Sequence, residues 1–371
     1  MAKKTVYIIG AGASYEAKLP TGEKLKHEIS KLFDNRIGLS PVKKQLLHSE
    51  DFIHHFEGFI NKDIRWALEI HSRNQSDDLY SYYRECQHIS ENMPLAISID
   101  NFIDSDPNNH KLALCGKIAI VKSILKAEKK SSFNFDKYSS FNSLDFNQLE
   151  NTWYLSFFKT LTENCSIENL TKRFKDITLI IFNYDRCIEH FLLHALKSYY
   201  KLATQQAADI ISNLQIIHPY GTVGSLEWDK TESETTIEFG GELNPNQLIS
   251  YAQRIRTFTE GTSAKYKKPI IKSMRYTERL VFLGFSFHPL NMKFLRAQSD
   301  EGYAPENDIK CFATAYGASN SDIESIKESI KFIYSGSILD NWESDITTNI
   351  EHTTCSQLFK DYSRSLGYSD M

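Results

Sequence analysis

The chain has 371 residues, of which 41% are hydrophobic and 24% charged, and its formal net charge is −4 at pH 7. These values are typical of a soluble globular protein with one large or two modest domains. The mild acidity gives no electrostatic reason to expect nucleic acid as the main partner. Because no apolar run approaches 18 residues and a strand pattern starts near the N-terminus, we expect a cytoplasmic protein without a signal peptide or membrane contact.

The most informative segment is a predicted strand over residues 5–9 that runs directly into a glycine turn. Continuous β-branched and aromatic residues suit a strand buried in a parallel sheet. Glycines remove Cβ atoms that would block a close ligand, and a helix starting near Ser14 presents backbone N–H groups to a phosphate. The pattern favours a nucleotide site, with an ordinary strand-to-helix turn as the alternative. The residues predicted to bind the nucleotide are Gly10, Ala11, Gly12, Ala13 and Ser14.

The dehydrogenase fingerprint GxGxxG does not fit this turn. Its third glycine would fall at position 15, where the chain has Tyr15. The pattern therefore argues against hydride transfer.

A helical insertion is predicted over residues 23–170, after the first strand unit. Apolar residues recur there at three- and four-residue spacing. The predicted helices cover 23–33, 41–47, 56–69, 79–89, 112–126 and 147–162, with a loop at 129–146. Another helix is expected to begin at Ser98 to Phe102, with Ser98 or Asp100 as its cap and a structural role for Asp100.

Strands alternate with helices from residue 177 onward. The predicted strands are 177–182, 214–217, 280–283 and 309–314, and the predicted helices are 187–200, 203–212, 244–258, 264–277 and one beginning at 321–328. This alternation implies an α/β fold, a Rossmann-like parallel sheet with helices on both faces. We expect its domain to comprise residues 1–22 and 171–335, followed by a C-terminal extension over 336–371.

Polar residues follow two of these strands, at the sheet edge where such folds bind ligands. Asn183 and Asp185 can point into one crevice while Tyr184 points the other way, although either residue could instead cap the next helix. His218 stands before a rigid turn and has the ordinary pKa of a general base near neutrality. The alternative is a turn histidine without chemistry.

A second backbone approach to the ligand is predicted at residues 284–287. Gly284 leaves room there and Ser286 offers a hydroxyl group. Asn291 follows five residues later and is expected to reach the same crevice. A plain strand-to-turn transition is the alternative.

Together these segments resemble the sirtuin-type NAD-binding domain, in the branch found in bacterial anti-phage defence proteins. The resemblance rests on four short motifs in the right order across nearly the whole chain, with two supporting matches. The motifs are the GAGxS loop at 10–14, the TxNxD strand end at 182–185, the histidine-glycine element at 218–221 and the G-[TF]-S segment at 284–286; the supporting matches are Pro20 and the segment 98–102.

The resemblance implies an NAD⁺ hydrolase that cleaves the nicotinamide–ribose bond. In this family Asn183 would position a ribose hydroxyl or water, Asp185 would bind the carboxamide and His218 would be the base, although strict alignment puts Tyr220 at that place. Hydrolysis, cyclisation and base exchange all remain open as outcomes. Such enzymes are kept inactive until triggered, so the resemblance also implies a homo-oligomer or an activating partner such as an ATPase, an Argonaute-type protein or a phage protein.

The six cysteines separate this chain from the deacylase members of the family. Those members carry a four-cysteine zinc module, usually two CxxC pairs, and no two cysteines here stand within a CxxC. Structural zinc sites normally use closely spaced ligands, so no metal is predicted and reduced thiols are expected. The competing functions are a protein deacylase and a non-catalytic NAD or ADP-ribose sensor.

Overall fold

The computed structural model describes residues 4–33, 60–136, 143–229, 236–257, 260, 264–296, 308–334 and 346–368. Six strands in this part of the chain form one sheet in which all neighbours are parallel. They are β1 (Thr5–Ile9), β2 (Ile177–Ile181), β3 (Gln215–Ile217), β4 (Arg279–Leu283), β5 (Ile309–Thr314) and β6 (Ile346–Glu351). Their spatial order, β3-β2-β1-β4-β5-β6, is that of doubly wound dinucleotide-binding domains, which confirms the predicted α/β, Rossmann-like fold.

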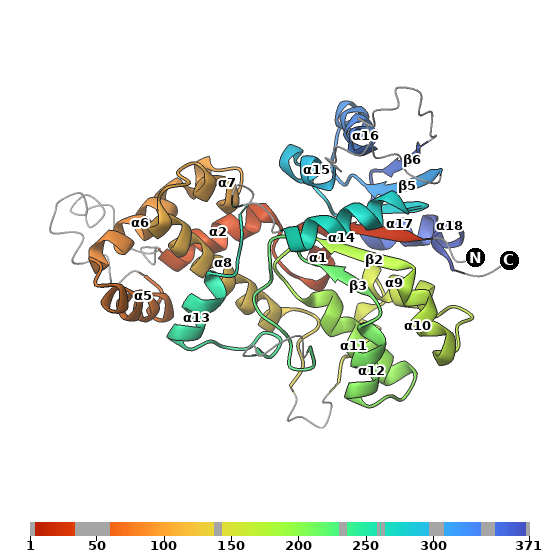
Figure 1. Ribbon diagram of the computed structural model, residues 1–371, viewed down its shortest axis with the longest axis horizontal. Helices are drawn as coiled ribbons and strands as arrows, with labels where there is room; N and C mark the ends of the chain where they lie inside the picture. The colour runs from red at the N-terminus through yellow and green to blue at the C-terminus, as the bar shows by residue number, and fades with distance from the viewer. Residues whose placement is uncertain are drawn as a thin grey trace.

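Helices cover both faces of this sheet, so its central strands are buried throughout (Figure 1). Alternate residues of β1 separate into two cores because successive side chains point to opposite faces. Tyr7 and Ile9 pack with α9 (Trp153–Thr162), α10 (Ile167–Lys175), α11 (Cys187–Tyr199), α12 (Thr204–Ile211) and α17 (Cys355–Asp361). Val6 and Ile8 pack with α14 (Ala264–Arg275), α15 (Pro289–Leu295) and α16 (Asn320–Tyr334).

A third core belongs to a helical unit at the left of Figure 1. It contains α2 (Gly22–Phe33), α5 (Lys62–Gln75), α6 (Leu79–Asn92), α7 (Ile99–Asp104), α8 (His110–Lys130) and α13 (Pro245–Ala252). The short element η4 (Met93–Leu95) also belongs to this unit, where it contacts α2 and α6. The short elements elsewhere are α1 (Ala11–Ser14), α18 (Ser363–Leu366), η1 (Tyr15–Ala17) and η5 (Phe146–Leu149). The helical insertion therefore has a core of its own, beside the sheet.

The boundaries of the insertion differ from the expected 23–170. Helices α9 and α10 fall within that range but pack on the sheet, whereas α13 lies beyond it and packs against α5 and α8. The unit thus needs a segment that returns after β3 to cover its apolar face. The predicted helix 41–47 and the start of 56–69 lie outside the described residues.

The predicted C-terminal extension belongs to the sheet domain. Within residues 336–371, β6 pairs with β5 and α17 packs on α9 and β5. Strand β6 is an edge strand whose residues are half-buried apart from the exposed Thr347, and most of them are polar, so it lacks the continuous apolar run of β1 or β2.

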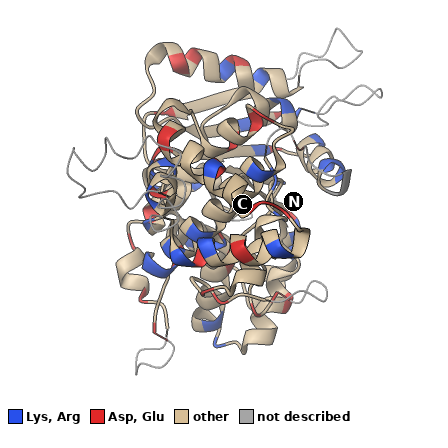
Figure 2. Cartoon of the chain, turned by 90° about the vertical axis from the view of Figure 1, so that its left-hand side faces the viewer, with Lys and Arg blue, Asp and Glu red and all other residues tan. Residues whose placement is uncertain are grey.

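The surface charges are mixed. Figure 2 shows Lys and Arg interspersed with Asp and Glu over the side that faces the viewer, in keeping with the small net charge. Among the described helices, none combines the length and the apolar character that crossing a bilayer requires.

Candidate functional site

The glycine turn packs directly on the end of β4, where the strand order reverses. Gly10 N donates to Leu283 O and Gly12 N donates to Gly284 O, both at 2.9 Å. A Cβ on Gly10 would lie 2.5 Å from Gly284 O, and a Cβ on Gly284, whose φ is +54°, would lie 2.0 Å from Ala13 N. Glycine is required here because two segments of backbone touch.

The same contacts occupy part of the predicted phosphate site. Gly12 N is bonded to Gly284 O, and Ala13 N donates to Gly10 O at 3.0 Å. Two of the amides expected to face a pyrophosphate are thus engaged within the protein. Helix α1 itself spans only four residues.

A buried polar network joins the glycine turn to the end of β2. Asn183 Nδ2 donates to Ser14 Oγ at 2.9 Å, and Ser14 Oγ donates to Asp185 Oδ2 at 2.7 Å. The other carboxylate oxygen, Asp185 Oδ1, accepts from Cys187 N, the first residue of α11, whose N-cap is Arg186. Burial raises the pKa of Asp185, and the bonds from Ser14 and Cys187 partly offset that effect. Both Asp185 oxygens are engaged within the protein, one of them at the start of α11.

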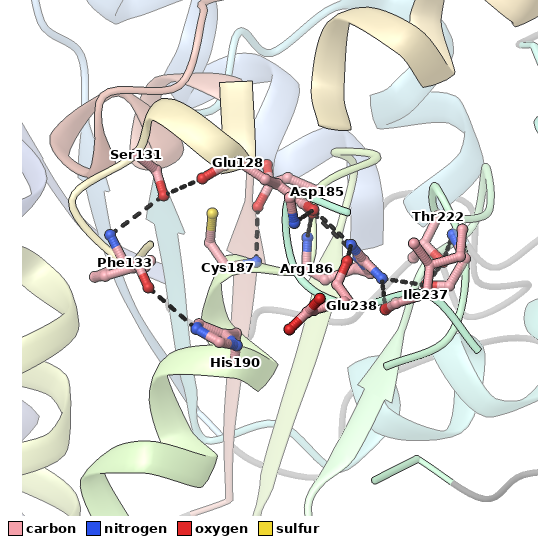
Figure 3. A network of polar contacts seen from close by, with 12 residues as sticks. Glu128, Ser131, Phe133, Asp185, Arg186, Cys187, His190, Thr222, Ile237 and Glu238 are labelled. Carbon is pink, nitrogen blue, oxygen red and sulfur yellow. Dashed lines mark hydrogen bonds and ion pairs between the residues drawn. The ribbon is translucent and has the colours of Figure 1, made fainter. Parts of the chain in front are cut away.

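Arg186, which follows Asp185, connects the segment after β2 to the helical unit through an ion pair with Glu128 (Figure 3). Its guanidinium is buried against Glu128 at the end of α8, with Nε 3.1 Å from Oε1. It also donates to the carbonyl oxygens of Ile237, at 2.8 Å, and Glu238, at 3.2 Å, while Gly240 N donates to Glu128 Oε2 at 3.0 Å. Every charged atom of the pair thus has a partner, as burial demands.

Tyr184 points away from Asn183 and Asp185, as expected, and contacts the helical unit. Its hydroxyl donates to Asp100 Oδ1 and lies 3.3 Å from Arg256 O. Ser98 caps α7 by accepting from Asn101 N, which confirms the first of the two caps considered for this helix. Burial raises the pKa of Asp100 to about 6 although the Tyr184 bond opposes the shift.

His218 follows β3 and is held at both ring nitrogens. Nδ1 lies 3.1 Å from Asn183 O, and Nε2 lies 2.6 Å from Glu189 Oε1 on the first turn of α11. Because a carbonyl oxygen only accepts, Nδ1 carries a hydrogen. Burial alone lowers the pKa of His218, but the Glu189 carboxylate, with help from the Asn183 carbonyl, raises that pKa above its ordinary value.

The His218–Glu189 pair lines a cleft of about 1040 Å³ beside β3. The two side chains are 11% and 14% exposed. Arg254 and Arg256 line the cleft as well, together with Trp228. Other lining residues are Arg186, Gln205, Ala208, Asp209, Ile211, Ser212, Leu214, Ile216, Gly221, Thr222, Gly224, Ser225, Leu226, Asp229, Gln253 and Tyr266.

The remaining predicted residues do not line this cleft. Asn291 is buried and its Oδ1 accepts from Tyr220 OH at 2.7 Å, while Ser286 is exposed. Tyr220 packs against the ring of Phe182. The structure therefore brings Ser14, Asn183 and His218 into one connected group, of which only His218 opens on the cleft.

The sequence did not predict a role for Glu189 or Arg186. Glu189 stands four residues after Asp185, one helical turn into α11, and that spacing was the available signal. The partner of each residue lies far along the chain, at 218 and 128.

A scan against protein-family models and a search of curated proteins each found no match for this chain. Among the described residues, no group of three or more His, Cys, Asp or Glu is arranged to hold a metal ion.

Proposed function

We propose that the chain hydrolyses NAD⁺ to nicotinamide and ADP-ribose, as its resemblance to the sirtuin-like anti-phage NAD hydrolases implies. The observation that carries the proposal is the contact series Ser14–Asn183–His218 at the carboxyl edge of the sheet, which ends on an open cleft. Ligand pockets commonly enclose about 300–1,000 Å³, so this cleft is large enough for a dinucleotide.

For NAD⁺ hydrolysis the protein needs to position the substrate and the attacking water and to supply one proton acceptor. When the bond between ribose C1′ and nicotinamide breaks, its electron pair leaves with a neutral base and the ribose becomes oxocarbenium-like, as in glycoside hydrolysis. Water then adds to C1′ and loses a proton. The acid–base pair formed by His218 and Glu189 receives that proton, and Asn183 orients His218 through its backbone carbonyl. Arg254 and Arg256 supply positive charge for the diphosphate.

A second candidate is a sensor that binds NAD or ADP-ribose without cleaving it. The observation that favours it is the engagement of both His218 ring nitrogens within the protein. A deacylase is disfavoured because the six cysteines lack the paired spacing of a zinc module.

The test is to incubate purified protein with NAD⁺ and separate the products by chromatography, with and without candidate partners. His218→Ala should lower nicotinamide release about 10²–10⁴-fold, the usual contribution of an oriented acid–base group, with unchanged circular dichroism. Asn183→Ala keeps the carbonyl that contacts His218 but removes the side-chain bond to Ser14 Oγ that fixes this segment, so it should also lower the rate. His110→Ala, an exposed histidine at the start of α8, is the matched control and should keep the wild-type rate. Wild-type rates in both site variants would contradict the proposal. Binding without product in every condition would favour the sensor.

Unrestrained NAD⁺ hydrolysis would deplete the host cell, so we also propose that oligomerisation or a partner (an ATPase, an Argonaute-type protein or a phage protein) activates the enzyme. Size-exclusion chromatography coupled to the same assay tests this control. A fully active monomer without any partner would contradict it.

A further inference from the structure

The pair formed by His218 and Glu189 holds a single proton on the line between Nε2 and Oε1. Nδ1 already donates to Asn183 O, so the imidazole has no open acceptor position while Glu189 stays in place. A base needs a lone pair that faces the reacting proton. In this arrangement His218 does not offer one.

Glu189 does offer one. Its second carboxylate oxygen, Oε2, is buried and has no hydrogen-bond partner among the described residues, although Glu189 lines the cleft. A buried carboxylate oxygen without a donor is unfavourable, and a donor brought by a ligand would relieve that cost. The free position of the pair therefore lies on the carboxylate.

We propose that Glu189 Oε2 is the proton acceptor of the reaction, an inference that rests on the proposed hydrolysis. His218 is then the cation that orients and stabilises the Glu189 carboxylate. The oxygen of the attacking water forms the bond to C1′, and its proton passes to Oε2. Glu189 is then neutral beside the imidazolium, and it returns the proton to solvent through the cleft.

Other charged groups around the pair belong to several elements. Asp185 and Arg186 lie between β2 and α11, Asp209 lies on α12 and the titratable Tyr266 on α14. Asp229, Arg254 and Arg256 line the cleft from intervening segments. These groups are the same in the wild type and in both variants of the pair, so differences between the pH profiles report on His218 and Glu189.

The experiment is the pH dependence of kcat for nicotinamide release by Glu189→Gln and His218→Gln. Glu189→Gln should lose about 10²–10⁴-fold in kcat with KM within a few-fold. His218→Gln should retain at least about tenfold more activity than Glu189→Gln, and its acid limb should move to higher pH because the carboxylate loses a neighbouring cation. Glu168→Gln, an exposed glutamate on the first turn of α10, is the control and should match wild type.

The reverse pattern would overturn the proposal. If His218 is itself the base, Glu189→Gln stays active and its acid limb moves to lower pH, because the imidazole loses the carboxylate that raises its pKa. Nitrogen NMR of His218 separates this question from the proposed function, since it needs no turnover. Protons on both ring nitrogens in wild type, and a lower imidazole pKa in Glu189→Gln, are expected. If the wild-type protein releases no nicotinamide, both the proposed hydrolysis and the role of Glu189 as proton acceptor are overturned. The NMR spectrum tests separately whether His218 and Glu189 share a proton, because it does not depend on activity.

Discussion

Two places along the carboxyl edge of the sheet are built in opposite ways. At the β1–β4 junction, where Rossmann-like folds usually bind their ligand, Gly10, Gly12 and Gly284 bring two backbones into contact. Beside β3, side chains surround an open cleft, with His218 and Glu189 in its wall. The glycine pattern after the first strand therefore has a packing role of its own, and the groups able to do chemistry lie two strands away.

The two places also depend on different forces. The β1–β4 junction is held by backbone contacts that tolerate no Cβ, whereas the β2–β3 side is anchored by the buried Arg186–Glu128 pair and by Tyr184–Asp100. Substitutions can therefore disturb one side at a time.

Glu128→Ala should have the largest effect on stability. It leaves the Arg186 guanidinium buried without its carboxylate, a change that typically costs about 3–5 kcal/mol. The free energy of unfolding in urea measures the loss. Glu242→Ala removes the exposed partner of Lys129 at the same helix end and serves as the control, with little change expected. Equal losses in the two variants would show that the buried pair does not anchor the β2 end.

Gly284→Ala should destabilise the protein by about 3 kcal/mol. The new Cβ would meet Ala13 N and Gly12 backbone atoms, which cannot swing aside as a side chain could, and φ is positive. Thermal or urea unfolding checks the value against Gly22→Ala, where a Cβ meets nothing within 4 Å. If both variants unfold like wild type, the junction is looser than described.

Asp100→Asn should change the pH dependence of stability by about 1–2 kcal/mol. The folded-state pKa of Asp100, about 6, lies above its unfolded value, so the folded protein binds this proton more tightly. The resulting stabilisation is present below about pH 4 and is lost as the pH rises to about 6. Unfolding of wild type and variant at several pH values between 4 and 7 should give a flatter curve for Asp100→Asn. Parallel curves would mean that Asp100 titrates normally.

The sequence predicted the parts of this fold that rest on continuous patterns. Strands β1, β2 and β4 are wholly buried and mostly apolar, and their alternation with helices implies the parallel sheet. Strand β6 escaped prediction because an edge strand is half-buried and reads as polar. The docking of α13 could not be predicted either, because an amphipathic pattern shows that a helix has an apolar face but not which helices cover it.

The candidate site was predictable to a similar extent. Asn183 and His218 follow strands, and the parallel sheet brings them together as expected. The internal bonds of Asp185 and of the glycine-turn amides could not be foreseen, since they depend on neighbours up to 273 residues away, as between Gly10 and Leu283. Glu189 was hidden for the same reason: a carboxylate on a helix has no evident role until the imidazole 29 residues later lies against it.

Two of the four tryptophans allow a direct test of the proposed nucleotide site. Trp228 lines the cleft, and its Nε1 is buried without a hydrogen-bond partner among the described residues, whereas Trp153 Nε1 donates to Ala13 O behind the glycine turn. The measurement is the NMR signal of each indole N–H during addition of ADP-ribose, with the signals assigned from Trp228→Phe and Trp153→Phe. We expect the Trp228 signal to move more than the Trp153 signal. A shift of Trp153 alone, or no shift of either signal at high ligand concentration, would contradict a nucleotide site in the β3 cleft.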